Sequence, residues 1–278
     1  MGVTVTSDAG LLLPRELDER LGLSALIETD VLTKERNYQG LARLNTDLVQ
    51  HEAARPLTRR LILDIDSSES PVHGAQEQSA YNGHFESVCY HPLFVFNQDG
   101  DCLAATLRPG NVHSADGWEK TLLPVIDRSQ ARGQAVVRAD AAFAIPALYE
   151  ALERWNVAYA IRLPDNAVLE RAIEDLLVRP LGRPCHAPLV RDRSVQYQAA
   201  SWDRPRRVIA KVEHHLGELF PRVGFIVTTL TGTNRAVVHF YNQRGTAEQW
   251  IKEGKKPLIG CASPATASGP TGSARSSG

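Results

Sequence analysis

The chain has 278 residues, of which 43 % are hydrophobic and 23 % charged, and its formal net charge is −1. These values predict a soluble, globular chain of one large domain or two modest ones. The sequence has no run of 18 apolar residues, which excludes a transmembrane helix, and it shows no secretory signal pattern. Four scattered cysteines without a C-x-x-C pair argue against a disulfide framework or a zinc site, so we expect a reduced, cytoplasmic protein.

The first part of the chain predicts helices and then strands. Residues 1–58 are expected to form an N-terminal helical region, because 8–27 have helical periodicity with a proline near the start. Residues 59–68 (RRLILDIDSS) alternate apolar and polar side chains, as a strand does, and end in polar residues. Residues 90–111 contain two apolar runs around NQDGD, which predicts a hairpin because Asp-Gly suits tight turns.

The middle of the chain predicts alternating helices and strands. Helices are expected over 117–133 and 145–156, and strands over 134–143 and 157–164. The order strand, hairpin, helix, strand, helix, strand across 59–164 predicts an α/β domain with a mixed sheet.

The last part of the chain divides into three segments. Residues 165–240 are more strand-like, with the apolar runs RRVIAKVEHH, RVGFIVTTL and RAVVHFY, and a helix is expected over 241–256. The final twenty residues consist mostly of Ala, Gly, Ser, Thr and Pro, which predicts a disordered tail.

Acidic residues follow two of the predicted strands. The first strand offers Asp64 and Asp66 on one face, the second offers Asp140, and the predicted C-terminal helix offers Glu248. Three carboxylates that converge repel one another unless a cation lies among them. Oxygen ligands suit Mg²⁺ or Mn²⁺, and two such ions can promote phosphoryl displacement. Acids at strand ends are also common without any metal, and that alternative stays open on spacing alone.

The predicted C-terminal helix aligns four functional side chains. Tyr241, Arg244, Glu248 and Lys255 lie at offsets 0, 3, 7 and 14, and at about 100° per residue they share one narrow arc of a helix. The cations could bind phosphates and the phenol could stack on a base. The alternative is an ordinary solvated face in which Arg244 and Glu248 form an i, i+4 pair.

A basic stretch lies in the strand-like segment. Residues 179–211 contain eight Lys or Arg against two Asp, with Tyr197 and Trp202 interleaved. This local excess of positive charge is a candidate surface for the DNA backbone, and a solvated surface without a partner is the alternative.

The blocks LDIDSS, RADAAF and YNQRGTAEQWIKEGK, in this order, resemble the three catalytic blocks of bacterial insertion-sequence DDE transposases. The last block matches the Y-x2-R-x3-E-x6-K signature at every spacing. The surrounding sequence, including LRPGNVHSADG, is similar to the group named after insertion sequence 1380. The resemblance covers roughly residues 59–256.

This resemblance implies a ribonuclease-H-like fold, with a mixed sheet, flanking helices and a β-rich insertion between the second Asp and the Glu. Residues 59–164 would form the first part of the core, 165–236 the insertion and 237–256 the catalytic helix.

The resemblance also implies the site residues and the chemistry. Asp66 matches the first acid, because the family places a hydroxyl residue two positions later, here Ser68, and Asp64 stays the alternative. Asp140 and Glu248 match the second and third acids. They would bind two Mg²⁺ or Mn²⁺ ions for cleavage at transposon ends and strand transfer to target DNA.

The implied partner is double-stranded DNA, bound by a homodimer in the nucleoid region of the cytoplasm, without a membrane partner. The residues that we expect to contact DNA are Tyr241, Arg244, Lys252, Lys255, Arg204, Arg206 and Arg207.

Two departures from the family pattern affect the expected activity. The N-terminal helical region is shorter than the family pattern implies, which predicts an internal deletion. The similarity ends after Lys256, and we interpret 257–278 as a frameshifted tail, which sequencing of the gene would test. A defective transposase is therefore one hypothesis. An inactive DNA-binding remnant and a host nuclease of the same fold are the alternatives.

Overall fold

The computed structural model describes residues 60–72, 76–130, 134–180, 182, 186–245, 249 and 251. The N-terminal region predicted over 1–58 and the tail predicted over 257–278 lie outside these residues. Within the described part of the chain, none of the helices is long and apolar enough to cross a membrane.

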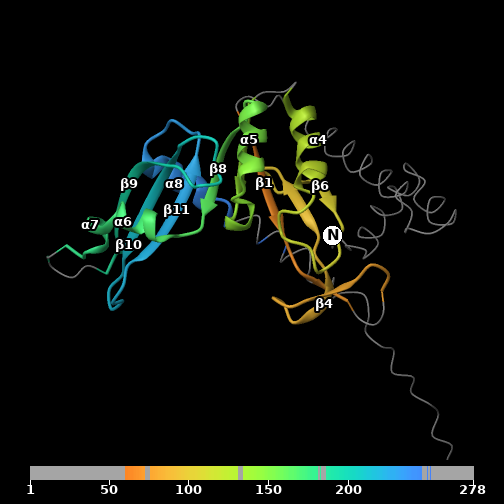
Figure 1. The fold of residues 1–278 in the computed structure, drawn as a ribbon, viewed down its shortest axis with the longest axis horizontal. Coiled ribbons are helices and arrows are strands. Elements are labelled where there is room, and N and C mark those ends of the chain that lie inside the picture. The colour runs from red at the N-terminus through yellow and green to blue at the C-terminus, as the bar shows by residue number, and fades with distance from the viewer. Residues whose placement is uncertain are drawn as a thin grey trace, which may run out of the picture.

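One large mixed sheet organises the fold (Figure 1). Its eight strands lie in the order β6-β5-β1-β7-β8-β11-β10-β9. The central strands β1, β7 and β8 are parallel, and the strands on both sides of them pair antiparallel. The strands are β1 (Arg60–Ser67), β5 (Leu93–Phe96), β6 (Cys102–Thr106), β7 (Gln134–Ala139), β8 (Ala158–Leu163), β9 (Leu189–Tyr197), β10 (Arg206–His214) and β11 (Arg222–Thr228).

The order of the first five strands, β6-β5-β1-β7-β8, is compatible with a ribonuclease-H-like fold. The predicted strands over 59–68, 134–143 and 157–164 are confirmed as β1, β7 and β8. The predicted hairpin over 90–111 is confirmed as β5 and β6, with Asn97 closing the turn through a backbone bond to Asp101.

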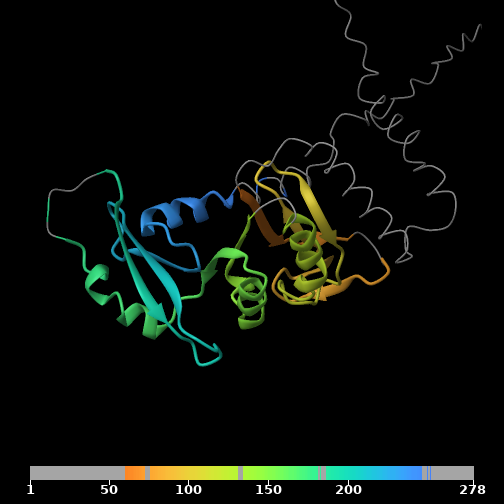
Figure 2. The same cartoon turned by 90° about the horizontal axis from the view of Figure 1, so that it is seen from above.

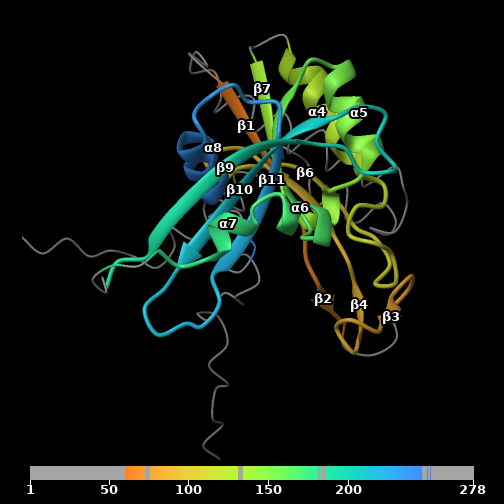
Figure 3. The same ribbon diagram turned by 60° about the vertical axis from the view of Figure 1, so that its left-hand side comes forward.

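A second, three-stranded sheet follows directly after β1 in the chain. It has the order β2-β4-β3 and is made by β2 (Ser70–Pro71), β3 (Ala80–Asn82) and β4 (Ser87–Tyr90). In Figure 3 it projects below the main sheet, away from α4 and α5.

The main core lies on one face of the large sheet. Alternate residues of the strands, such as Leu63, Val137 and Ile161, are fully buried there against the helices. These helices are α4 (Trp118–Gln130), α5 (Pro146–Arg154), α6 (Ala167–Arg171) and α7 (Glu174–Leu177). Both predicted helices of the central segment, 117–133 and 145–156, are confirmed as α4 and α5.

The helix α8 (Asn234–Asn242) covers part of the opposite face (Figure 2). Its Val237 and Val238 pack with Ile209 and Ile226 in a small second cluster. The strand predicted for RAVVHFY is therefore wrong. Thr233 caps the segment as a helix by accepting a hydrogen bond from the amide of Ala236 at 3.3 Å.

The segment predicted as a β-rich insertion, 165–236, contributes β9, β10 and β11. These strands extend the main sheet, because β11 pairs with β8 from Phe225 opposite Leu163 onward. The segment also contains α6 and α7. Its description as an insertion stays a prediction.

Candidate active site

Asp66 and Asp140 lie at the same end of two neighbouring strands. β1 and β7 are parallel and adjacent, Asp66 is near the end of β1, and Asp140 directly follows β7. The amide of Ser67 donates to Asp66 Oδ1 at 2.9 Å, and the amide of Ala142 donates to Asp140 Oδ1 at 3.0 Å. Asp140 thereby caps the short 3-10 helix η1 (Ala141–Phe143), which orients its carboxylate.

Arg244 brings these two acids together. Its Nη2 atom lies 3.0 Å from Asp66 Oδ1 and 3.8 Å from Asp140 Oδ2. Asp66 and Arg244 are buried, whereas the Asp140 side chain is 37 % exposed. The guanidinium offsets the repulsion that the two carboxylates would otherwise exert on each other. We call Asp66, Asp140 and Arg244 the acidic centre.

Asp64 lies on the same face of β1 but in a different environment. It is fully buried, and both of its carboxylate oxygens accept hydrogen bonds of 2.6 Å from Arg138. Burial raises the pKa of the Asp64 carboxyl, and the hydrogen bonds from Arg138 oppose that rise. Asp64 is therefore held in a closed ion pair, whereas Asp66 faces Arg244.

The last turn of α8 carries the first residues of the expected DNA-binding helix. The sequence pattern predicts this helix from Tyr241 and the family resemblance predicts it from residue 237, whereas α8 starts at Asn234 and ends at Asn242. The start at Tyr241 is therefore wrong, and residues 237–242 are helical as the resemblance implies. The amide of Arg244 bonds to the carbonyl of Tyr241 at 2.9 Å. The described residues do not include Glu248, Lys252 or Lys255. The arc that Glu248 and Lys255 would share with Tyr241 and Arg244 therefore stays a prediction.

The three expected DNA-binding arginines outside α8 all contact other parts of the protein. Arg206 is 3 % exposed and bonds to Glu153 and Asp203. Arg204 also bonds to Glu153, and its side chain is 56 % exposed. Arg207 donates to the carbonyls of Leu230 and Gly232. A DNA contact by Arg206 would require it to leave its carboxylate partners, and the role of the three in DNA binding stays a prediction.

Sequence reasoning did not single out two residues of this arrangement. Arg138 was read only as part of a predicted strand, and Glu153 as part of a predicted helix. A charged residue inside an otherwise apolar strand, as in AVVRA, is the signal that could have identified Arg138, because a buried charge requires a partner. Glu153 carries no comparable local signal.

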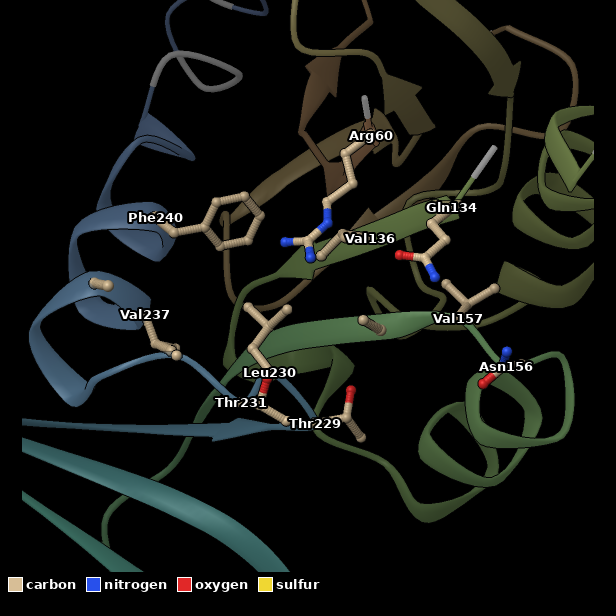
Figure 4. Close-up of a pocket in the computed structure, with 14 residues that line it drawn as sticks. Arg60, Gln134, Val136, Asn156, Val157, Thr229, Leu230, Thr231, Val237 and Phe240 are labelled. Atoms are coloured by element: carbon tan, nitrogen blue, oxygen red, sulfur yellow. The ribbon is translucent and has the colours of Figure 1, made fainter. Parts of the chain in front are cut away.

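A pocket of about 650 Å³ lies at the opposite end of the parallel strands (Figure 4). Arg60, Gln134 and Ala158, which begin β1, β7 and β8, line it together with one side of α8 that includes Val237 and Phe240. None of the described residues that line it has a carboxylate side chain. The acidic centre and this pocket are therefore separate sites, one at each end of the central strands.

The described part of the chain contains two of the three predicted metal ligands. Among the described residues, no group of three or more His, Cys, Asp or Glu side chains is arranged to hold a metal ion. The acidic centre supplies two carboxylates, and the predicted third ligand, Glu248, is outside the described part of the chain.

Comparison with known proteins places the chain in a family. Residues 26–262 match the model of the family described as transposase DDE domain group 1. The comparison with curated proteins found no match. The matched range includes β1, β7 and α8, which carry the acidic centre, and it covers most of the sequence. The chain therefore belongs to the transposase DDE domain group 1 family.

Proposed function

We propose that this chain is a DNA transposase that uses Asp66, Asp140 and Glu248 to bind two divalent ions, Mg²⁺ or Mn²⁺. The observation that carries the proposal is that Asp66 and Asp140 both lie within 4 Å of one Arg244 atom, at the carboxyl ends of adjacent strands. The Y-R-E-K signature and the group named after insertion sequence 1380 belong to the same proposal.

The donors fit such ions. Carboxylate oxygens are preferred by Mg²⁺ and Mn²⁺, and a cationic group already lies between the two acids. Asp64 is a poorer candidate for the first ligand, because Arg138 engages both of its oxygens. Bound ions would supply an activated water and offset the charge that develops on the scissile phosphate.

The chain's own residues have distinct roles in this proposal. Asp66 and Asp140 hold the ions on the rigid end of the sheet. Arg244 and Tyr241 orient the DNA strand, since a guanidinium binds phosphate and a phenol donates a hydrogen bond or stacks on a base. Water attacks the phosphorus, the bond from phosphorus to the 3′ oxygen breaks, and that oxygen takes up a proton. The resulting 3′-hydroxyl then attacks a target phosphodiester, forming a new phosphorus–oxygen bond while the target's own bond to its 3′ oxygen breaks and releases a target 3′-hydroxyl.

Further DNA contacts in this proposal come from basic residues outside the acidic centre. Arg204, Arg206, Arg207, Lys252 and Lys255 would contact the backbone, and two copies of the chain would pair on DNA. The family implies DNA as the partner.

The experiment measures strand nicking of a duplex that contains a transposon end, with Mg²⁺. Wild type is compared with Glu248→Ala, and Asp127→Asn on the exposed side of α4 is the matched acidic control. We expect at most weak nicking by wild type and by the control, because of the shortened N-terminal region and the altered tail, and none by Glu248→Ala. Equal nicking by wild type and Glu248→Ala would reject the assigned site. Salt-dependent DNA binding without nicking in any variant would favour an inactive remnant.

A further inference from the structure

Arg138 is on β7, two residues before Asp140 of the acidic centre, and its side chain is 3 % exposed. It belongs to β7 and points to the sheet face that α8 covers. Burying a guanidinium is costly unless its donors find partners, so each contact of Arg138 calls for an explanation. The hydrogen bonds and the ring contact described for its side chain are with β1 and α8.

The first contact joins β7 to β1. Asp64 and Arg138 are direct register partners in the parallel pair, and Nε and Nη2 of Arg138 donate to the two oxygens of Asp64 at 2.6 Å each. Such a two-bond fork fixes the direction of both side chains as well as their distance. Asp66 and Asp140 each follow a member of this pair by two residues, so the pair orients both strands just before the acids.

The second contact joins β7 to α8. Nη1 of Arg138 donates to the carbonyl of Phe240 at 2.7 Å, and its guanidinium carbon lies 5.0 Å from the centre of the Phe240 ring. Phe240 is in the last turn of α8, where the final carbonyls lie beyond the helix's own hydrogen-bond ladder. A cation is favourable at this end of a helix.

The three elements joined by Arg138 are the elements that carry the acidic centre. Four residues beyond Phe240, Arg244 reaches Asp66 on β1 and Asp140 after β7. A shift of the last turn of α8 relative to the sheet would therefore change both distances at the centre.

We propose that Arg138 is a positioning residue: its fork to Asp64 and its bond to Phe240 set the last turn of α8, and with it Arg244, against the two acids. This inference rests on the proposed function for its catalytic meaning. Its structural part, the control of α8 by Arg138, does not depend on that function.

A matched control lies elsewhere in the chain. Arg206 is equally buried and also forms a two-bond fork, to Glu153, but it contacts no part of the acidic centre. Replacing either arginine by methionine leaves a buried carboxylate without its main partner, so both changes should destabilise the fold. Only the change at Arg138 should alter the acidic centre.

The first experiment is amide hydrogen exchange on full-length Arg138→Met, Arg138→Lys, Arg206→Met and wild type. Compared with Arg206→Met, which is destabilised as well, we expect about tenfold faster exchange over 239–245 in both Arg138 variants. Arg138→Lys keeps the charge but loses the fork, so it provides the test if Arg138→Met does not fold. Unchanged exchange over 239–245 in a folded Arg138 variant would overturn the proposal.

The second experiment measures Mn²⁺ affinity of the folded proteins by electron paramagnetic resonance, and kcat and KM for nicking. Arg138 variants should bind Mn²⁺ 10- to 100-fold more weakly and lose kcat with KM for DNA nearly constant, because residues that support ligands usually have effects of this size. Arg206→Met should bind Mn²⁺ with wild-type affinity. The nicking control is Asp127→Asn, which should match wild type, because Arg206 is itself a proposed DNA contact.

An Asp66→Asn reference separates the two proposals. If Asp66→Asn loses Mn²⁺ binding and the Arg138 variants keep wild-type affinity, only the positioning role fails. If Asp66→Asn binds Mn²⁺ as wild type does, the proposed ligand set fails, and the exchange rates over 239–245 still decide the role of Arg138.

Discussion

Two clusters of arginines and carboxylates in this chain use the same residue types in opposite ways. In the Glu153 cluster (Glu153, Asp203, Arg204 and Arg206), one carboxylate accepts hydrogen bonds from Arg206, Arg204 and Tyr159. In the acidic centre, two carboxylates share one guanidinium, and Asp140 is partly exposed. The first arrangement balances two carboxylates with two guanidinium groups, whereas the described residues of the second set two carboxylates against one guanidinium.

The two clusters also differ in what surrounds their central ion pair. The Arg206 guanidinium carbon lies 5.3 Å from the ring centres of both Tyr149 and Trp202, so aromatic rings enclose the pair. The acidic centre lies at the end of β1 and β7, where Asp140 reaches solvent. The charge-balanced cluster, with the Arg206–Glu153 pair at its centre, stabilises the fold, whereas a cluster with more carboxylates than cations favours a further cation. Charge balance, rather than residue type or exposure, therefore distinguishes the structural cluster from the candidate site, since Arg204 and Asp203 are 56 % and 50 % exposed and Asp140 is 37 % exposed.

The largest expected effect is on the stability of the charge-balanced cluster. Arg206→Met should lower the free energy of unfolding by about 3 kcal/mol, because the 11 % exposed Glu153 loses the two-bond fork from buried Arg206 but keeps Arg204 and Tyr159 as partners. Urea unfolding measures this loss. A loss below about 1 kcal/mol would contradict the comparison, because such values are typical of exposed pairs.

The second effect contrasts the two acids of β1. Asp66→Asn should reduce nicking by about 10²–10³-fold, the size seen when one electrostatic contact to the reacting group is removed. Its loss of stability should be smaller than that of Asp64→Asn, because Arg244 keeps Asp140 as a second carboxylate partner. Asp64→Asn should mainly destabilise, because it weakens the partner of buried Arg138. Nicking rates and urea midpoints of both variants decide the assignment, and the reversed pattern would make Asp64 the ligand.

The third effect is a pH dependence of stability that comes from Glu153. Burial acts to raise the pKa of Glu153, but the hydrogen bonds from Arg206, Arg204 and Tyr159 outweigh it and lower the pKa from 4.5 to about 2. A lowered pKa in the folded state stabilises the fold above pH 4.5, and this contribution is lost as the pH falls from about 4.5 towards 2.

The full contribution is about 3 kcal/mol, at 1.36 kcal/mol per pKa unit, and about 2 kcal/mol of it is lost between pH 7 and pH 3. Urea unfolding at pH 7 and pH 3 measures it, with Glu153→Gln as the control that should lack this part of the pH dependence. Parallel pH profiles in wild type and Glu153→Gln would show that Glu153 is not the source.

The smallest effect concerns DNA binding by the exposed edge of the Glu153 cluster. Arg204→Gln should weaken binding to any duplex and lower the slope of affinity against salt by about one, as loss of one phosphate contact does. The control is Arg222→Gln, an exposed arginine that pairs with Glu218 on a distant hairpin. An unchanged slope for Arg204→Gln would assign Arg204 to the fold alone.

Much of the secondary structure could be predicted from local patterns. The alternating run RRLILDIDSS and the apolar run QAVVRA became β1 and β7, and Asp-Gly marked the hairpin turn between β5 and β6. The run RAVVHFY could not be assigned in this way, because a short apolar run fits both a strand and a buried helix face. The cap at Thr233 and the packing of Val237 and Val238 against the sheet stabilise this run as a helix.

The positions of the acids at strand ends were determined by the sequence alone, because strand periodicity puts Asp64 and Asp66 on one face and places Asp140 just after the next strand. Which arginine pairs with which carboxylate was decided only by the tertiary structure. Asp64 meets Arg138 through the register of β1 and β7, and Arg244 reaches Asp66 through the docking of α8. The physical reason is that an ion pair between distant residues depends on register and helix docking, and neither leaves a local pattern in the chain.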